Sequence, residues 1–374
     1  MGVSDPPIND KGGFMQKSKH SPRGKSGSKI EALFILARQK EASDLYLAPG
    51  EHPVLKIHGK LERLKEYPVL AGSRIEELFY ATLSPTEQQN FENWMELELT
   101  YTTEAAGTIQ IILYTSENGI GAACRLLPFK IPSLGDMGPI ESLEKIPSFD
   151  RGLILITGKA NCAKAITIAS IIDHINTQSN KSIVTIEDPI RFAHKSKSSL
   201  IFQREVGLHV KNYVGGLQTA MRSDMDVIYF TEIDSPETLI MAMTAAESHL
   251  VLTTSISFGS VAWAIRKLFD FFPADRQEYV RTHLSRVLRA LIWQHLIPVE
   301  GHTDTKVAME IMFNNEKISA LIQNGKLHKV HGEIQKGSEG MQTMHSSVSK
   351  MGKIAVDIWK LMAADVGTTL LLAL

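Results

Sequence analysis

Four short apolar runs alternate with helical segments between about residues 150 and 260, and this alternation restricts the fold more than any other feature. The runs are "GLILIT", "SIVTIED", "MDVIYFTEI" and "SHLVLTTSI". Each is apolar almost without interruption, as strands are when a parallel sheet is covered on both faces. The helix after the third run has a clear start, with Ser235 as its N-cap and Pro236 in its first turn. We therefore predict an α/β domain over residues 150–260.

The segments on either side follow other patterns. Residues 29–145 combine helical spacing with short strand candidates and Gly-bearing turns, which predicts a small α+β domain. Beyond residue 260, the stretches "SVAWAIRKLFDFF", "DRQEYVRTHLSRVLRALIWQHLI" and "EKISALIQN" have helical spacing. We expect residues 261–374 to form a helical bundle that follows the sheet domain.

The two ends of the chain have distinct compositions. Residues 1–28 are rich in Gly, Ser, Pro and Lys and lack an apolar period, so we expect a disordered extension there. Its basic charge suits either a solvated tail or a binding arm. The final segment, "KIAVDIWKLMAADVGTTLLLAL", is apolar but interrupted by Asp357, Lys360 and Asp365. It predicts an amphipathic helix that packs or faces a partner, with contact at a membrane surface as the alternative.

Composition narrows the class of protein. The formal net charge of -1 over 374 residues gives no reason to expect a nucleic-acid partner. Cys124 and Cys162 are the two cysteines, which argues against a disulfide framework and favours a reducing cytosol. Apolar runs long enough for a membrane span are missing, and the lysines near the start precede no apolar signal-peptide core.

The loop between the first strand and its helix reads "GKANCAKA" over residues 158–165. A phosphate-binding loop in this setting has the pattern G-x-x-x-x-G-K-[ST]. Gly158 and Lys164 match it, whereas Ala163 replaces the second Gly and Ala165 replaces the Ser or Thr. The segment is therefore either a nucleotide loop that has lost residues or an ordinary strand–turn–helix connection with one exposed lysine.

The two alanines act on different parts of such a site. If position 163 needs a left-handed backbone, Ala163 is strained there by roughly 1–2 kcal/mol. Ala165 has no hydroxyl to bind Mg²⁺, which is the task of Ser or Thr at this position. Thr167 lies two residues further on, so we expect it on a different face of the helix and a poor substitute.

Several separate stretches resemble the pilus-retraction ATPases, the PilT/PilU branch of the type II/IV secretion ATPases. "EASDLYLAPGEHPVLKIHGKLERL" is similar to the family's N-terminal "ASDLHL" region, and "IVTIEDPIRFAHKSKSSLIFQREVG" is similar to its "LTIEDPIEF.H…S.I.QREVG". "MDVIYFTEI" falls in the Walker B region, and "GEIQKGSEGMQTM" resembles the family's final "GMQT" motif. The similarity runs from about residue 29 to 345, with the segments in the family's order.

The resemblance implies an architecture and an activity. It implies a PAS-like N-terminal domain over 29–145 and a RecA-like P-loop NTPase core over 150–260, followed by the helical region. Members of the family form hexameric rings at the cytoplasmic base of pilus machines. They bind ATP between the two domains and use its hydrolysis to return pilin subunits to the inner membrane.

The resemblance also implies roles for particular residues. Glu232 takes the place of the carboxylate that activates water, and Glu187 with Asp188 takes the place of the acidic pair that positions water or metal. Structural alternatives stay open: Glu232 as a cap of the next helix, and Asp188 before Pro189 as a turn. The implied nucleotide-binding set is Gly158, Lys159, Ala160, Asn161, Cys162, Ala163, Lys164, Ala165, Ile166 and Arg125.

Around these residues the chain departs from the family. Thr231 and Asp234 stand where the family has Gly and Arg beside the catalytic glutamate. Ile256 falls at the family's histidine position, and we expect the nearby His249 to be buried in its strand rather than to replace that histidine. The reversed charge at Asp234 is unfavourable for holding ATP.

Two further motifs have lost their polar residues. Thr108, Gln110 and Asn118 occupy positions where the family has arginines that reach the phosphates, so that Arg125 is the one retained. Ser319 and Ala320 replace the Arg and Asn of the family's retraction motif, while the apolar spacing of that helix is kept. A plain packing helix is the alternative there.

These departures lead to three hypotheses. The first is a non-hydrolysing accessory or regulatory subunit that docks on retraction ATPases, as a homo- or hetero-oligomer, or on the inner-membrane pilus platform protein. The second is a weak ATPase that still powers retraction, and the third is a protein of a disused locus. ATP and Mg²⁺ are the implied cofactors, no other metal site is expected, and the expected location is the cytoplasm, peripheral to the inner membrane.

Overall fold

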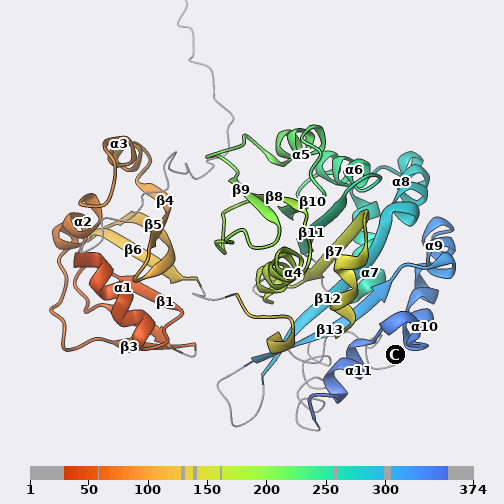
Figure 1. Ribbon diagram of the computed structural model, residues 1–374. Helices are drawn as coiled ribbons and strands as arrows, with labels where there is room; N and C mark the ends of the chain where they lie inside the picture. The colour runs from red at the N-terminus through yellow and green to blue at the C-terminus, as the bar shows by residue number, and fades with distance from the viewer. Residues whose placement is uncertain are drawn as a thin grey trace, which may run out of the picture. The chain divides into compact units, whose positions relative to one another are not determined.

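The computed structural model describes residues 29–57, 59–127, 131–137, 141–160, 162–256, 259–298 and 305–352 (Figure 1). The chain divides into two compact units, Met1–Phe129 and Lys130–Leu374. The extension expected over residues 1–28 and the amphipathic helix expected in the final apolar segment lie outside the described residues. Both units combine helices with sheets, which confirms the predicted α/β class.

The first unit is built on an antiparallel six-stranded sheet in the order β3-β2-β1-β6-β5-β4. Alternate residues of β4 (Glu96–Thr103) are buried, so one face of this sheet meets the core. The other strands are β1 (Asp44–Leu47), β2 (Val54–Ile57), β3 (Lys60–Arg63), β5 (Gly107–Ser116) and β6 (Gly119–Leu126).

Three helices complete this core: α1 (Lys29–Gln39), α2 (Gly72–Tyr80) and α3 (Pro85–Trp94). The start of α3 is fixed by a capping box, in which the Ser84 hydroxyl accepts a hydrogen bond from the Glu87 N–H at 3.3 Å. In return the Glu87 carboxylate accepts one from the Ser84 N–H at 2.7 Å. The helices and strands that the sequence pattern indicated here are confirmed, and the PAS-like identity of the unit stays a prediction.

The second unit is built on a seven-stranded sheet in the order β13-β12-β7-β11-β10-β8-β9. β7 (Gly152–Gly158), an inner strand between β12 and β11, is buried at every residue, as the run "GLILIT" predicted. β12 pairs antiparallel with β13, and the other neighbouring pairs are parallel. The remaining strands are β8 (Ser182–Glu187), β9 (Leu200–Glu205), β10 (Val227–Glu232), β11 (Leu250–Ile256), β12 (Leu288–Pro298) and β13 (Thr305–Phe313).

Helices surround this sheet (Figure 1). Within the described part of the chain, none of them combines the length and apolar character that crossing a bilayer requires. Their bounds are α4 (Lys164–Gln178), α5 (Tyr213–Arg222), α6 (Pro236–Ala245), α7 (Val261–Asp270), α8 (Ala274–Val287), α9 (Glu316–Gln323), α10 (Val330–Gln335) and α11 (Met344–Ser349).

The expectation of an all-helical region after residue 260 is wrong. The helix expected through "DRQEYVRTHLSRVLRALIWQHLI" ends at Val287, and the chain continues as β12 and then β13. Because β12 lies between β7 and β13, most of its side chains are buried on both faces. A mostly apolar strand that is buried on both faces cannot be distinguished from a buried helix by periodicity.

The predicted domain boundaries also shift. β12 and β13 belong to the same sheet as β7, so no separate domain starts at residue 261. Leu143, which the prediction assigned to the N-terminal domain, is fully buried in the core of the second unit, and so is Ile146, which lies between the two predicted domains. The second unit therefore begins near residue 130 rather than 150.

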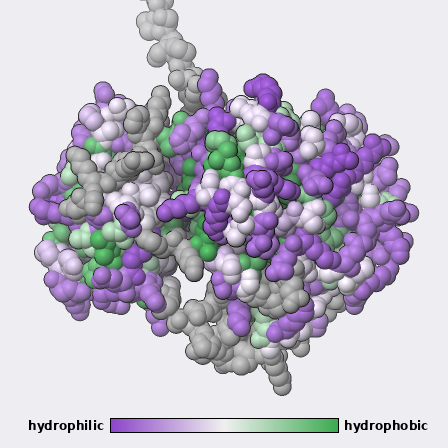
Figure 2. Space-filling model, in the orientation of Figure 1, coloured by the Kyte–Doolittle hydropathy of each residue, from purple (hydrophilic) through white to green (hydrophobic). Residues whose placement is uncertain are grey.

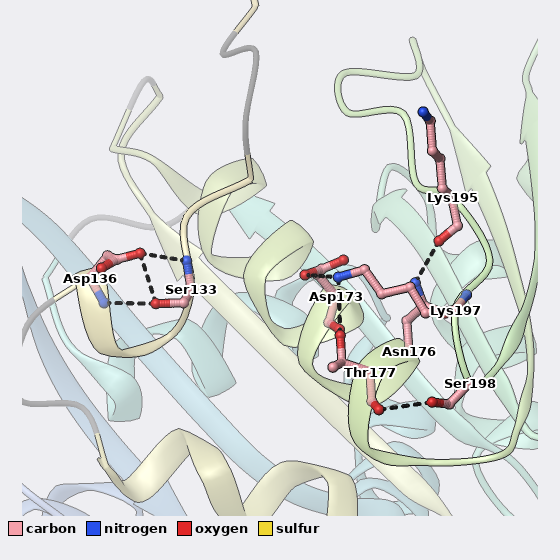
Figure 3. Close-up of polar contacts among 8 residues, drawn as sticks. All are labelled: Ser133, Asp136, Asp173, Asn176, Thr177, Lys195, Lys197 and Ser198. Carbon is pink, nitrogen blue, oxygen red and sulfur yellow. Dashed lines mark hydrogen bonds and ion pairs between the residues drawn. The ribbon is translucent and has the colours of Figure 1, made fainter.

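The far end of α4 is fastened to the segment that leads into β9, as Figure 3 shows. The Asn176 amide donates to the Lys195 carbonyl at 2.8 Å and accepts from the Lys197 N–H at 3.0 Å. The Lys197 ammonium also pairs with the Asp173 carboxylate at 2.8 Å. These contacts hold α4 in place, and the loop of interest lies at its other end.

Candidate functional site

Four parallel strands end at one edge of the sheet, and the predicted site residues lie at these ends. β7 ends at Gly158, β8 at Glu187, β10 at Glu232 and β11 at Ile256. The strand register places Gly158 opposite Ile256 on one side and opposite Gln294 of β12 on the other. The carboxyl edge of a parallel sheet is where α/β proteins form their ligand sites.

Ala163 adopts the left-handed conformation that its place in the loop pattern requires. It precedes α4 with φ 66° and ψ 18°, so the condition under which strain was expected at this position is met. A non-glycine residue in this region is strained by roughly 1–2 kcal/mol. No side chain caps the N-terminus of α4, whose positive end therefore lies at the loop. Asn161 lies outside the described residues.

Lys164 folds back onto the loop. Its ammonium group donates hydrogen bonds to the carbonyl oxygens of Gly158 at 3.1 Å and of Lys159 at 2.9 Å. The pKa of Lys164 is lowered, because the effect of partial burial outweighs the opposite effect of the nearby Glu232 carboxylate. The side chain is half-buried, unlike the exposed lysine expected in an ordinary connection.

Gln294 holds the loop in position, and sequence reasoning missed it. Its side chain is fully buried, its amide nitrogen donates to the Cys162 carbonyl, and its amide oxygen accepts from the Thr167 hydroxyl at 2.9 Å. Gly158 lies against the same strand, and a Cβ on it would collide with the Gln294 carbonyl and the Cys162 sulfur. The path of the loop is therefore set by its packing against β12.

These contacts decide whether the loop fits Mg²⁺. Ala165 offers no hydroxyl, and the buried hydroxyl of Thr167 is engaged by Gln294, so neither can ligate a cation at the phosphates. Among the residues that the structure describes, no group of three or more His, Cys, Asp or Glu side chains is placed to hold a metal ion. The backbone turn and Lys164 fit phosphate, whereas the hydroxyl ligand for the metal is missing.

Glu232 is a half-buried carboxylate near Lys164. The pKa of Glu232 is raised overall, and burial is the main cause. The Lys164 ammonium opposes this rise, and the Asp234 carboxylate adds to it. The alternative that Glu232 caps α6 is wrong, because the Ser235 hydroxyl is the cap and accepts from the Thr238 N–H at 3.2 Å. Asp234 also turns to this helix, where its carboxylate accepts from the Thr238 hydroxyl at 2.6 Å.

Glu187 is almost entirely buried, at 6% exposure. Its Oε1 accepts hydrogen bonds from the Thr185 hydroxyl at 2.7 Å and the Gln203 amide at 3.0 Å. Burial raises the pKa of Glu187 to about 7 despite these hydrogen bonds. A carboxyl group with such a pKa can hold or release a proton near neutral pH. The chain bends at Asp188 and Pro189, as predicted, across a cis peptide bond.

Thr231, which stands where the family has Gly, has a structural task here. Its hydroxyl accepts from the Asp188 N–H at 3.0 Å, and its carbonyl accepts from the Thr254 hydroxyl at 2.6 Å. These two contacts tie the ends of β8, β10 and β11 together. The substitution therefore strengthens the scaffold at the sheet edge.

Arg191 is a second residue at the site that the sequence motifs did not predict. It lines a small hollow together with Ala165 and Glu187. Burial lowers the pKa of Lys164, and the positive charge of Arg191 adds to this effect. Burial raises the pKa of Glu232, and the charge of Arg191 opposes this effect. The signal was present in "IEDPIRF", where the family's motif reads "IEDPIEF". A positive charge replaces a negative one beside the loop.

Ile256, which stands at the family's histidine position, and His249, the nearby histidine of this chain, lie at opposite ends of β11. The backbone of Ile256 pairs with Gly158, so the family's histidine position does adjoin the loop. His249 precedes the first residue of the strand and is 8% exposed, which confirms that it is buried. It cannot replace a histidine at the other end of the strand.

Arg125 belongs to the first unit and forms an ion pair there. It lies on β6, and its guanidinium donates to the Asp44 carboxylate of β1 at 3.2 Å. The register also places Gln110 of β5 opposite Arg125. The structure thus gives Arg125 a partner within its own sheet, and its predicted role toward nucleotide stays a prediction.

The helix of the predicted retraction motif is α9. Its buried residues Ile318 and Ile322 pack inward, and the Ser319 hydroxyl donates to the Ser285 carbonyl of α8 at 2.9 Å. This arrangement matches the alternative of a packing helix.

Comparisons with known proteins agree with this architecture. The model of the type II/IV secretion system protein family matches residues 139–357. PilT of Pseudomonas aeruginosa, a type IV pilus retraction ATPase, is 33% identical over 317 residues, which cover 84% of this chain and 91% of PilT. PilU of the same organism, a type IV pilus ATPase, is 28% identical, and the match covers 86% of this chain and 84% of PilU.

Solved structures extend the comparison. A crystal structure of the pilus retraction motor PilT with bound ADP superposes with a TM-score of 0.81 at 32% identity, covering 88% of this chain and 96% of that one. The ATPase DotB of Legionella pneumophila has the same fold, with a TM-score of 0.76 at 21% identity over 94% of this chain and 99% of DotB. The chain therefore belongs to the type II/IV secretion system protein family, and within it to the PilT- and PilU-like type IV pilus motor proteins.

Proposed function

We propose that this protein is a non-hydrolysing member of the pilus motor family, an accessory or regulatory subunit of pilus retraction. The observation that carries the proposal is the loss of the metal-ligating hydroxyl. Ala165 has none, and the hydroxyl of Thr167 is buried against Gln294. Phosphoryl transfer depends on the cation and on positioned positive charge, so a loop without the cation's ligand turns over slowly.

Other losses act in the same direction. Asp234 replaces the family's Arg next to Glu232, and Ile256 stands at the histidine position. The loss of one preorganised donor typically costs about 10²–10³ in rate. Such effects need not add, because the residues act as one unit. A chain without several of them is nevertheless expected to hydrolyse ATP far more slowly than its relatives.

Nucleotide binding is a separate property from hydrolysis. The related PilT motor has been crystallised with ADP. In this chain the left-handed turn at Ala163, Lys164 and the uncapped start of α4 support weak binding of nucleotide phosphates. Arg191 adds a positive charge at the same edge of the sheet. We propose that ADP or ATP binds weakly and that Mg²⁺ does little to improve the binding.

The proposed partners follow from the family. PilT and PilU are pilus motor ATPases. We propose that this chain joins them in a mixed hexameric ring, or docks on the ring or the membrane platform protein, at the cytoplasmic side of the inner membrane. Within a ring, a subunit that does not hydrolyse ATP would slow or bias the action of its active neighbours.

A weak but genuine ATPase is the second candidate. It is favoured by the acidic residues that remain at the sheet edge, Glu187 at the end of β8 and Glu232 near Lys164. If hydrolysis persists, Glu232 is the expected base.

Phosphate release by the full chain, with and without Mg²⁺, separates the two candidates. If the chain is an accessory subunit, Glu232→Gln should leave phosphate release unchanged at background level. If the chain is an ATPase, it should release phosphate, and Glu232→Gln should abolish this release. The double change Ala163→Gly with Ala165→Ser should improve ATP binding in a thermal-shift titration much more than it improves hydrolysis. Full turnover after this repair would contradict the weight given to the other losses.

The proposed partnership needs its own experiment. The tagged chain, produced in a cell that has pili, should co-purify with intact PilT-like ATPase subunits. Recovery of the chain alone, under conditions in which PilT-like subunits recover one another, would contradict the accessory role.

A further inference from the structure

A cavity of about 340 Å³ lies at the start of β7, the end away from the loop. The strand has seven residues, so the two sites are separated by roughly 20 Å. Side chains from four parts of the second unit line the cavity. They are Arg151 just before β7, Glu247 after α6, Tyr279, His283 and Arg286 of α8, and Arg289 of β12.

Positive charge dominates this cavity, with three arginines against one carboxylate. The Arg151 guanidinium donates to the Glu247 carbonyl at 3.3 Å, and that of Arg289 donates to the Arg286 carbonyl at 2.8 Å. Among the residues that the structure describes, the Arg286 guanidinium makes no hydrogen bond or ion pair. Guanidinium groups present paired N–H donors that match the oxygens of a phosphate.

His283 supplies a second observation that points to a ligand. Its side chain is only 11% exposed, and its Nε2 lies 2.9 Å from the Glu247 carboxylate. Neither buried ring nitrogen, Nδ1 or Nε2, makes a hydrogen bond of normal geometry to the described residues, and Nε2 has only the ion-pair contact with Glu247. Buried polar atoms normally have a partner, so a ligand oxygen or hydroxyl in the cavity would complete the bonding of this ring.

The cavity also has an aromatic wall. The ring of Tyr279 is 62% exposed, and its centroid lies 5.8 Å from that of His283. An exposed tyrosine ring can pack against a planar group such as a base. On the face that Figure 2 shows, the surface over α8 is hydrophilic.

The backbone is shaped to admit Arg289. Gly152 has a φ of 121°, and a Cβ there would collide with the Arg289 side chain and lie 2.9 Å from the Val287 carbonyl. Only glycine leaves this space without strain. The Arg289 side chain occupies this space, and its hydrogen bond to the Arg286 carbonyl at 2.8 Å orients it there.

We propose that this cavity binds a small phosphate monoester with a planar group, of which a nucleoside monophosphate is the simplest. The arginines would hold the phosphate, His283 a ligand oxygen, and Tyr279 the planar group. The volume lies within the range of small-molecule sites. The site is separate from the loop at Lys164 and does not depend on the proposed function.

Isothermal titration of the full chain with AMP, ribose 5-phosphate and inorganic phosphate tests this assignment. AMP should bind most tightly of the three. Arg286→Gln should weaken its binding at least tenfold. Arg276→Gln makes the same change in the first turn of the same helix, outside the cavity, and should leave binding unchanged. Lys164→Ala should also leave it unchanged, which separates this site from the loop.

Four results would overturn the proposal. One is an absence of AMP binding at millimolar concentration. Another is a loss of binding in Lys164→Ala, which would place AMP at the loop. The third is equal weakening by Arg276→Gln and Arg286→Gln, which would indicate general electrostatic attraction. The fourth is competition by a hexaglutamate peptide where inorganic phosphate does not compete, which would indicate an acidic protein partner.

Discussion

Replacing Ala163 with glycine should stabilise the protein in the absence of any ligand. Ala163 has a φ of 66°, a conformation that strains a non-glycine residue by roughly 1–2 kcal/mol. Glycine relieves the strain but adds freedom to the unfolded chain, which costs about 0.4–1 kcal/mol. We expect a net gain of about 0.5–1 kcal/mol in the free energy of unfolding. For a unit of this size the corresponding rise in Tm is about 1–4 °C.

Thermal unfolding without nucleotide isolates the backbone effect, and Ala165→Gly is the matched control. Ala165 is the second residue of α4, where glycine lacks any strain to relieve. The control should lower the free energy of unfolding by about 0.5–1 kcal/mol, the usual cost of glycine in a helix. If Ala163→Gly lowered the Tm as much as Ala165→Gly does, the strain ascribed to the loop would not exist.

Three further predictions concern other parts of the molecule. Burial raises the pKa of Glu187 from 4.5 to about 7, so its contribution to stability is complete below pH 4.5 and is lost as the pH rises through 7. Urea unfolding at pH 5 and pH 8 should show a smaller difference in Glu187→Gln than in the native chain, and an equal difference would contradict the raised pKa. Gln294→Ala removes the donor to the Cys162 carbonyl and leaves the Thr167 hydroxyl only the Ala163 carbonyl at 3.3 Å, and should lower the free energy of unfolding by about 1–3 kcal/mol in the same assay. Ser84→Ala removes the cap of α3 and should cost about 1 kcal/mol, detectable as a lower urea midpoint; unchanged midpoints would refute these last two.

The parallel strands were predictable because burial on both faces leaves an almost unbroken apolar run. β7, β8, β10 and β11 all carry this pattern, and the start of α6 carries its cap and proline in the sequence. β12 has the same apolar character but follows α8 without a break, which made it read as more helix. β9 and β13 were not predicted. β9 is only partly buried, so it lacks the unbroken apolar run that marks the inner parallel strands.

The site was predictable only in part. The positive φ of Ala163 followed from the loop pattern, since the residue it replaces there is glycine. The Gln294 support could not be foreseen, because its contact with Thr167 spans 127 residues and depends on β12 lying beside β7. The pKa of Glu187 likewise depends on burial by elements that the sequence does not place.

The support of the loop by β12 has a consequence for how this protein changes over time. Because Gln294 and the sheet fix the turn, its shape does not rest on the side chains at positions 163 and 165. Phosphate affinity can therefore be lost or regained by exchanging single side chains while the framework endures. Two such changes, Ala163→Gly and Ala165→Ser, separate the present loop from the pattern G-x-x-x-x-G-K-[ST].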